Sequence, residues 1–596
     1  MDYRTRLQAS IDCIRHCVRQ GHALRGHDES EPSKNRGNFI ELLKFHARGR
    51  QDVERVVLKN APKNLQMTSP DIQKDIVHAI ASEITKGIIC DIGDDVFSIL
   101  VDEARDTSIK EQMAIVLRYV NEEGYVMERF LGIAHVADTK ALTLKMEIES
   151  MLVTNGLSLS KIRGQGYDGA SNMSGKINGL KTLILAENSS AYYVHCFAHQ
   201  LQLTLVAVAR HHGAVSDLIN LVGGSSKRMD KIRECQAAKV VEALCRGELE
   251  TGRGLNQELG LKRHCDTRWG SHFDTLLNLT RIYSSLIECL DIIIWEGNSD
   301  AKADASCLLR LVQNFDFVFI LKMMIGVLSI TSELSSTLQR KDQDIVNAMH
   351  LVRGAKFRLQ EMRDKGWDSL LDSVFSFCNK ESLPIVNMDD LYFPLGRLRR
   401  KSEEITNLHH YKVELFYTIV DMQLQELNSR FDEINTELLC CVACLNPDDS
   451  FADFDKEKLL KLATFYPNEF SKDDISHLDL HQLDAYIFDM KTVERFAGLK
   501  GIAELSREMV VSKKHRVFPL VYRLLKLALF LPVATASVER AFSAMNFVKN
   551  TLRNRMSDEI MNDFLVGYIE SDILDSLDDE CILHTFQNMK ARRGSL

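Results

Sequence analysis

A change in the hydrophobic pattern near residue 95 constrains the fold of this chain more than any other feature. Upstream, segments such as NFIELLKFHAR place apolar residues at the three- and four-residue spacing of helices. Downstream come three short runs rich in Val, Ile, Phe and Tyr, separated by polar turns: DVFSILVDEA, QMAIVLRYVNEEG and YVMERFLGIAHV. They predict three antiparallel strands, with Glu123-Gly124 in a hairpin turn, after a helical N-terminal region.

The following residues alternate between helix and strand patterns. We expect a helix over Lys140 to Thr154, a short strand ending in IRGQGYDGAS, a helix over INGLKTLILAE and a strand AYYVHCF. The order β-β-β-α-β-α-β-α requires a mixed sheet, because parallel neighbours need crossover connections, which are almost always right-handed. We therefore predict an α/β, RNase H-like core built on a mixed five-stranded sheet.

The strand signal nearly vanishes from about Leu201 to Val511. Windows such as YKVELFYTIVDMQLQELNSRF have the length and apolar spacing of helices, which predicts a large all-α insertion that interrupts the core. The stretch FPLVYRLLKLALFLPVA returns to strongly apolar helices, with Pro519 and Pro532 as boundaries. Such an apolar helix must pack against the distant core or against a second subunit.

The chain is too long, at 596 residues, for one compact core, so several structural units are expected. The predicted segments are an N-terminal helical region over 1–92, the first part of the RNase H-like core over 93–210, a helical insertion domain over 211–510, C-terminal core helices over 511–580 and a tail over 581–596.

The charge and cysteine content limit the partners and the compartment. With 74 basic and 83 acidic residues, the net charge of −9 does not favour a polyanion, although local Lys and Arg clusters can still bind DNA. The 14 Cys lack the spacing of a disulfide scaffold, which indicates a reducing compartment. No signal peptide or membrane span is apparent, so we expect a nuclear protein, with the cytoplasm as the alternative.

Three acidic residues are candidates for metal chemistry. Asp102 ends the first strand in SILVDEARDTS, and Asp168 lies in GQGYDGASNMSG, where glycines are expected to let the backbone turn tightly. Two carboxylates on adjacent strands repel each other unless a cation such as Mg²⁺ neutralises them. A two-metal site needs a third carboxylate, for which Glu539 in PVATASVERAFSAM is the candidate. Taken singly, each also fits a turn, cap or surface residue.

Six motifs follow one another in an order that carries a family resemblance: GNFIELL, ILVDEARDTS, GQGYDGASNMSG, VHCFAHQLQL, CDTRWGSH and FLPVATASVERAFSAMNFVKNTLRNRM. With them the chain resembles hAT-superfamily transposases, especially the branch of zinc finger MYM-type and TTF-type zinc-finger-like proteins, from about residue 20 to residue 570. The resemblance implies that Asp102, Asp168 and Glu539 form a DDE triad that holds Mg²⁺ or Mn²⁺. Asp106 is the alternative for the first position, because DEARD offers two Asp residues.

The resemblance also implies DNA contacts. It places His199, in a C-x-x-H element with Cys196, beside the DNA, and it implies that Trp269 stacks on a flipped base while Arg268 holds a phosphate. From the residues alone, the C-x-x-H element is more typical of a packing Cys and a hydrogen-bonded His, and Trp269 fits a core position equally well.

The N-terminus departs from the family pattern, because many relatives carry a zinc-binding, DNA-recognising finger upstream. The segment IDCIRHCVRQGHALRGH contains two Cys and three His, but its spacing favours one helix with a polar face over a folded zinc site. The usual means of recognising a DNA sequence is therefore not expected here.

Two functions are supported by particular features, and a third, a nuclease or nucleic-acid enzyme of different substrate, has the same expected fold but no distinguishing residue. The first is a domesticated or degenerate, transposase-derived nuclear protein that dimerises through the C-terminal region, which the resemblance places at about 489–568. The second is an active hAT transposase that performs metal-dependent phosphodiester cleavage and strand transfer, with DNA as its partner. We favour the first, because the acidic balance and the N-terminal departure remove the usual means of finding a DNA end. A homodimer is expected in both cases.

Overall fold

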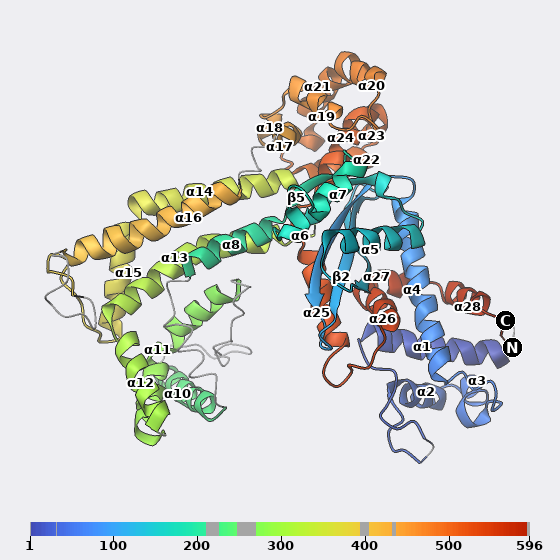
Figure 1. The fold of residues 1–596 in the computed structure, drawn as a ribbon, viewed down its shortest axis with the longest axis horizontal. Coiled ribbons are helices and arrows are strands. Elements are labelled where there is room, and N and C mark those ends of the chain that lie inside the picture. Colours follow the sequence, from blue (N-terminus) through green and yellow to red (C-terminus); the bar gives the residue numbers. More distant parts are fainter. Residues whose placement is uncertain are drawn as a thin grey trace. The chain divides into compact units, whose positions relative to one another are not determined.

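The computed structural model describes residues 2–30, 32–209, 226–246, 270–297, 299–341, 343–393, 405–431 and 437–592 (Figure 1). Contacts divide it into two compact units. Unit 1 comprises Met1–Ala198, Gln339–Ala348 and Asn435–Leu596, and unit 2 comprises His199–Leu338 and Met349–Ile434. We expected the helical insertion to continue to residue 510, whereas the contacts group residues from 435 onward with the sheet.

Unit 1 is built around a five-stranded sheet of order β3-β2-β1-β4-β5. The strands are β1 (Phe97–Arg105), β2 (Glu111–Val120), β3 (Val126–His135), β4 (Ile162–Tyr167) and β5 (Tyr192–His195). The first three pair antiparallel, whereas β4 runs parallel to β1 and β5 parallel to β4. The predicted mixed sheet, a meander followed by two strands reached through helices, is confirmed.

The β2–β3 turn lies where the sequence indicated it. Gly124 adopts a φ of +84°, a left-handed conformation that a residue without Cβ reaches without strain. Asn121 closes the turn, because its side-chain oxygen accepts a hydrogen bond from the Tyr125 amide at 2.8 Å. Local turn chemistry therefore sets the register of this hairpin.

Helices of both chain ends belong to unit 1. Those of eight residues or more are α1 (Asp2–Arg19), α2 (Asn38–Arg48), α4 (Pro70–Ile92), α5 (Ala141–Thr154), α7 (Leu180–Glu187), α19 (Lys456–Thr464), α21 (Leu483–Thr492), α22 (Ile502–Val511), α24 (Pro519–Phe530), α25 (Ala536–Val548), α26 (Asp558–Ile569) and α28 (Asp579–Asn588). The shorter ones are α3 (Gln51–Glu54), α6 (Ser171–Ser174), α17 (Glu437–Ala443), α18 (Asp448–Phe451), α20 (Lys472–His477), α23 (Lys514–Val517) and α27 (Ser571–Ser576). Helix α8 (Phe197–Ala209) leads from unit 1 into unit 2.

The two chain ends pack together, as Figure 1 shows. Tyr3 on α1 donates a hydrogen bond to Gln587 on α28 at 3.1 Å. Helix α1 ends at Arg19, earlier than the single long helix that we expected, because Gly21 has a φ of +68° and reverses the chain. Cys13 and Cys17 are buried on α1, and burial raises the pKa of the Cys13 thiol to about 12 and that of Cys17 to about 11. These thiols therefore serve as apolar core residues.

Helix α24 is the strongly apolar helix for which two packing partners were predicted, the distant core or a second subunit. Its apolar side chains are buried against β2, β4 and neighbouring helices of the same unit. Of the two alternatives, the structure supports packing against the core. The apolar character of this helix is thus accounted for without a second subunit.

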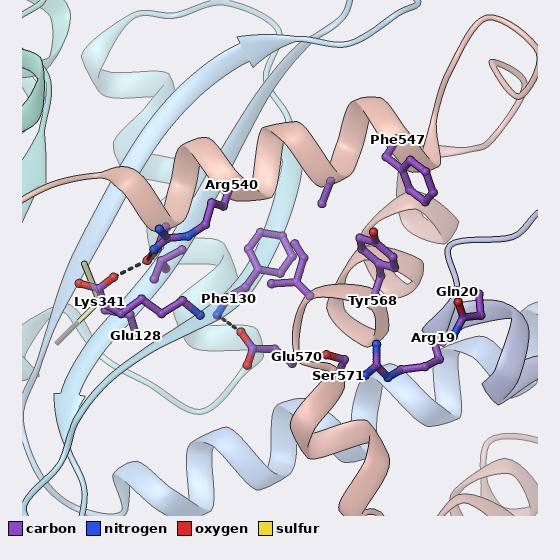
Figure 2. Close-up of a pocket in the computed structure, with 14 residues that line it drawn as sticks. Arg19, Gln20, Glu128, Phe130, Lys341, Arg540, Phe547, Tyr568, Glu570 and Ser571 are labelled. Atoms are coloured by element: carbon purple, nitrogen blue, oxygen red, sulfur yellow. Dashed lines mark hydrogen bonds between the residues drawn. The ribbon is translucent and has the colours of Figure 1, made fainter. Parts of the chain in front are cut away.

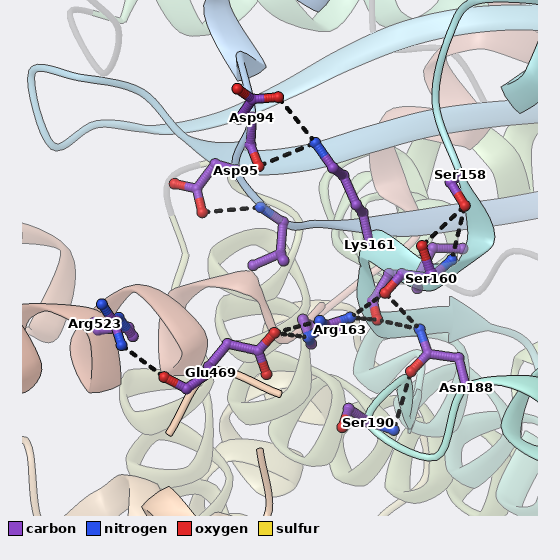
Figure 3. Close-up of polar contacts among 12 residues, drawn as sticks. Asp94, Asp95, Ser158, Ser160, Lys161, Arg163, Asn188, Ser190, Glu469 and Arg523 are labelled. Carbon is purple, nitrogen blue, oxygen red and sulfur yellow. Dashed lines mark hydrogen bonds and ion pairs between the residues drawn. The ribbon is translucent and has the colours of Figure 1, made fainter. Parts of the chain in front are cut away.

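Residues after 435 are tied to the start of β4 by a polar network (Figure 3). Arg163 donates to Glu469 at 2.8 Å, and Arg523 on α24 donates to the Glu469 carbonyl at 2.6 Å. Asn188 donates to the carbonyls of Leu159 and Ile162 at 2.8 Å. Side chains thus satisfy backbone groups where the strand begins.

A buried ion pair connects the meander to the C-terminal helices. Arg118 on β2 lies 2.7 Å from Glu128 on β3, and both side chains are almost inaccessible. Arg118 also donates to the carbonyls of Leu529 and Gln343, at 2.9 and 2.7 Å. Ser537 at the start of α25 donates to Glu128. Since each charge has several partners, the cost of burying the pair is offset.

In the part of unit 2 that the structure describes, the regular elements are helices. These are α10 (Ser226–Cys245), α11 (Gly270–Glu296), α12 (Ser299–Val312), α13 (Phe315–Leu338), α14 (Ile345–Lys365, which begins in unit 1), α15 (Trp367–Lys380), a π-helix (His409–Tyr417) and α16 (Thr418–Arg430). Among the described residues, α13 alone is long and apolar enough to cross a membrane, and 61% of its most apolar window is buried inside the structure. Burial of this kind is typical of a core helix.

We predict that Lys549→Met destabilises unit 1. Lys549 at the end of α25 lies 2.7 Å from Asp106 in the turn after β1, and both side chains are buried, so the variant leaves a buried carboxylate without its cation. We expect a loss of about 3 kcal/mol in the free energy of unfolding at pH 7, measured by urea denaturation.

The pH dependence and a surface control test the same pair. Although burial alone would raise the pKa of Asp106, hydrogen bonds from Lys549 and Ser108 hold it well below its usual range. The contribution of the pair is therefore complete above about pH 4 and is lost as the pH falls further. Lys140→Met, at an exposed pair with Asp138, should change nothing measurable. Equal stabilities of the two variants would contradict a structural role for Lys549.

Candidate functional site

Asp102 and Asp168 lie at one edge of the sheet. In the parallel pairing of β1 and β4, Leu100 is opposite Gly166, so the chain reaches Asp102 and Asp168 two residues further along each strand. Because parallel strands end at the same edge, the two carboxylates come from neighbouring positions. Asp168 is held by its own loop, since its side chain accepts a hydrogen bond from the Ala170 amide at 3.0 Å.

Glu539 reaches this edge through the segment that precedes α25. The Phe197 amide donates to the Val533 carbonyl at 2.9 Å, just after β5. The Thr535 amide donates to the Cys196 sulfur at 3.2 Å, and the Cys196 amide donates to the Tyr167 carbonyl at 2.9 Å. Helix α25 therefore begins beside the ends of β4 and β5, with Glu539 in its first turn.

The glycines of GQGYDGASNMSG serve packing rather than the tight turn that we expected. None of them has a positive φ. A Cβ atom on Gly166 would lie 2.7 Å from Leu100 Cδ2 and 2.8 Å from Pro532 Cβ, and a Cβ on Gly169 would lie 2.7 Å from the His195 ring. Gly166 is thus required because Pro532 lies directly on β4.

Asp168 and Glu539 both act electrostatically on Asp102. Burial raises the pKa of Asp102 to about 8, and the negative charges of Asp168, Glu103 and Glu539 raise it as well. A hydrogen bond of 2.9 Å from the Glu103 amide acts in the opposite direction. Asp102 therefore stands among like charges that favour its protonated form.

Glu103 is a fourth acidic residue at this edge, which the sequence analysis did not consider. Burial raises the pKa of Glu103 to about 6, against the effect of a hydrogen bond from Asn172, and the charge of Asp168 raises it further. Asn172 donates to Oε1 at 2.7 Å, whereas Oε2 is buried with no hydrogen-bond partner among the described residues. Two sequence features could have identified Glu103: its position next to Asp102, and the presence of Asn172 in the same motif as Asp168.

Asp106 is occupied by structural contacts. Its carboxylate accepts hydrogen bonds from the Ser108 and Lys110 amides at 2.7 and 3.1 Å and from Gln112 at 3.1 Å, in addition to the ion pair with Lys549. Both oxygens of this carboxylate therefore have partners that hold the turn after β1. The geometry therefore favours Asp102 over Asp106 for the first acidic position.

The donor set at this edge consists of carboxylate oxygens, which are the ligands that Mg²⁺ and Mn²⁺ prefer. Asp102, Asp168 and Glu539 suit such an ion by chemistry, and the unpartnered oxygen of Glu103 adds a fourth donor. Across the described ranges, no three acidic, His or Cys side chains are gathered closely enough to form a metal-binding group. The acidic edge therefore has suitable donors without an assembled metal site.

The predicted DNA contacts are only partly within the described residues. Arg268 and Trp269 fall in 247–269, outside them, and His199 is the first residue of unit 2, on α8. Cys196 is buried against Ala534 and Ala536 and accepts hydrogen bonds from Thr535, as expected of a packing Cys. The DNA-binding roles of His199, Arg268 and Trp269 remain predictions.

Two family models match separate parts of this chain. Residues 1–179 match the family model described as ZMYM1/FAM200, RNase-like domain, and residues 489–573 match the hAT family C-terminal dimerisation region. The chain thus combines an RNase-like domain with a hAT-derived C-terminal region, which confirms the resemblance inferred from its motifs.

Particular relatives align with almost the whole chain. It is 23% identical over 584 residues to the human 52 kDa repressor of the inhibitor of the protein kinase, covering 94% of this chain and 73% of that protein. The mouse protein of the same name is also 23% identical, covering 94% of this chain and 74% of the relative.

We predict that Asp102→Asn stabilises the fold at alkaline pH. The raised pKa means that the folded chain holds a proton that the unfolded chain releases near pH 4, so stability falls as the pH rises from about 4 to about 8. An uncharged side chain removes this loss. We expect the variant to be more stable than the wild type by roughly 1 to 3 kcal/mol at pH 8, and equally stable at pH 4, in urea denaturation.

Asp138→Asn is the matched control for this measurement. Asp138 is an Asp whose pKa is lowered to about 2 by hydrogen bonds from Lys140 and Thr143, so its replacement should not stabilise the chain at pH 8. If Asp102→Asn behaves like this control, the carboxylates do not crowd one another as described.

Proposed function

We propose that this chain is a domesticated, transposase-derived nuclear protein that acts as a regulator through self-association and protein contacts. The observation that carries the proposal is the alignment over 94% of the chain with proteins named as repressors of a protein kinase inhibitor. The cellular role thus resembles repression rather than transposition. The RNase H-like character of the core is part of this proposal, and the strand order β3-β2-β1-β4-β5 supports it.

Self-association is supported by the match of residues 489–573 to a dimerisation region. Since α24 is buried within unit 1, a dimer contact must use other surfaces of the region. Its exposed apolar side chains include Val511, Val517 and Leu552, of which Leu552 is 98% exposed. These side chains lie on separate segments, α22, α23 and the turn after α25, and each is proposed as a contact with a second copy.

We predict a homodimer at micromolar concentration, measured by size-exclusion chromatography with light scattering. Asp substitutions at Val511, Val517 and Leu552, made singly and together, should shift the dimer toward monomer, because each places a charge at the proposed contact. Leu142→Asp, at an apolar residue of α5 that is 61% exposed and lies outside the matched region, should leave the dimer intact. A monomeric wild type would exclude this mode of action.

An active hAT transposase is the second candidate. The feature that supports it is the position of Asp102 and Asp168 after neighbouring parallel strands, with the charge of Glu539 also acting on Asp102. These three residues would hold Mg²⁺ or Mn²⁺, and such ions activate a hydroxyl nucleophile and stabilise the leaving oxygen of a phosphodiester. A bound cation would lower the pKa of Asp102, so ligation and loss of its proton would be coupled. DNA contacts by His199, Arg268 and Trp269 belong to this candidate.

A metal-dependent nicking assay separates the two candidates. With Mn²⁺ or Mg²⁺ and either transposon-end or generic duplex DNA, we expect no cleavage above background from the wild-type chain. If the wild type nicks DNA and Asp168→Asn loses the activity by 100-fold or more, the transposase candidate replaces our proposal. Asp94→Asn, at an exposed Asp beside a surface lysine, controls for a general effect of charge.

A further inference from the structure

A cavity of about 520 Å³ lies in unit 1 on another face of α25 (Figure 2). Ser537, Arg540, Ala544 and Phe547 line it, and their three- and four-residue spacing places them on one side of the helix. Glu539 lies about 100° around the helix from Arg540, since α-helices contain 3.6 residues per turn. The cavity is therefore separate from the acidic edge of the sheet.

Three cationic side chains from different parts of the sequence line this cavity: Arg19, Lys341 and Arg540. Lys341 has no hydrogen bond or ion pair through its ammonium group in the part of the chain that the structure describes. Within the described ranges, the hydrogen bonds of Arg540 go to neutral oxygens, the Ser537 hydroxyl at 2.8 Å and the Gln339 carbonyl at 3.2 Å. Arg19 binds Asp575 through Nε at 3.1 Å, and Figure 2 shows its guanidinium directed toward Ser571.

The two acidic residues of the lining, Glu128 and Glu570, are each paired with an arginine outside the cavity, and the charge of Lys341 also acts on Glu570. Glu128 is bound by Arg118 at 2.7 Å. Glu570 accepts a hydrogen bond from the Phe130 amide at 2.6 Å and is bound by Arg129 at 2.8 Å. The cavity therefore presents an excess of positive charge, which attracts an anion.

An aromatic wall stands beside the cations. The rings of Phe547 and Tyr568 are stacked, with centroids 5.6 Å apart and planes inclined by 23°. Phe547 is 54% exposed, and Gly21 packs so closely that a Cβ there would lie 2.4 Å from its ring. The pair is thus held in place on one side while it lines the cavity. An exposed aromatic surface of this kind suits a flat heterocycle.

We propose that this cavity binds the phosphate monoester of a nucleotide, with Lys341 and Arg540 contacting the phosphate and Phe547 packing against the base. Arginine and lysine are the side chains that bind phosphate oxygens most strongly, and the Ser537 hydroxyl lies beside them as a further polar group. The cavity volume is adequate for a ligand of this size. The proposal depends neither on catalysis nor on dimerisation.

Calorimetric titration of the full chain at low ionic strength tests whether the cavity binds a nucleotide. The probes are inorganic phosphate, adenosine and adenosine 5′-monophosphate. We expect the monophosphate to bind at least ten times more tightly than either of the others, because it alone engages both the cations and the aromatic wall. A single-stranded oligonucleotide with a 5′ phosphate then identifies the source: competition indicates a nucleic-acid end, and its absence indicates a free nucleotide.

Variants assign the binding to the cavity. Lys341→Gln and Arg540→Gln should each weaken binding of the monophosphate at least tenfold, and Phe547→Leu should weaken the monophosphate while leaving phosphate unchanged. Lys74→Gln and Arg48→Gln, at exposed residues outside the cavity, should have no effect. Arg118 contacts only the backbone carbonyl of Lys341, which the substitution leaves in place, so the Lys341 variant should keep the wild-type circular dichroism spectrum and thermal midpoint. Binding that is absent in the wild type, unchanged in Lys341→Gln and Arg540→Gln, or equal for adenosine would overturn the proposal.

Discussion

The candidate site depends on one interaction, in which the segment from Pro532 to Thr535 packs against strands β4 and β5. Pro532 lies on Gly164 and Gly166, and Val533 and Thr535 bond to the two residues that follow β5. Backbone hydrogen bonds are directional, so they fix where α25 begins more narrowly than apolar packing alone would. These hydrogen bonds bring Glu539 toward Asp102, although the two residues are 437 positions apart in the sequence (539 − 102).

The sequence was most informative where structure is local. The five strands appear where short β-branched and aromatic runs indicated them, because period and turn chemistry act within ten residues. The extent of α1 and the role of the glycines were judged less well. Both depend on what lies on the other side of the backbone: Gly21 faces Phe547 and Gly166 faces Pro532, each hundreds of residues away. A sequence pattern contains no information on such partners.

Charge burial shows the same division between local and long-range information. The motif DEARD supplies three acidic residues, and the sequence analysis could not decide between Asp102 and Asp106. The structure separates them by their partners, since Lys549 and backbone amides neutralise Asp106, whereas Asp102 meets further carboxylates. Glu103 follows Asp102 within β1, which continues to Arg105, so strand alternation alone predicts that it faces away from Asp102. Its partner Asn172 comes from α6, which follows β4.

Helix α25 contributes residues both to the acidic edge of the sheet and to the cationic cavity, which Arg19, Lys341 and Arg540 line. Its first turn carries Glu539 toward the acidic edge and Ser537 and Arg540 toward the cationic cavity. Ser537 also donates to Glu128, which Arg118 binds, so the position of this turn is coupled to a buried ion pair in the meander. A buried pair of this kind has few alternative arrangements, because displacing either charge leaves the other unpaired. A regulator that retains the transposase scaffold would thus retain a rigid α25 whether or not the carboxylates act on DNA.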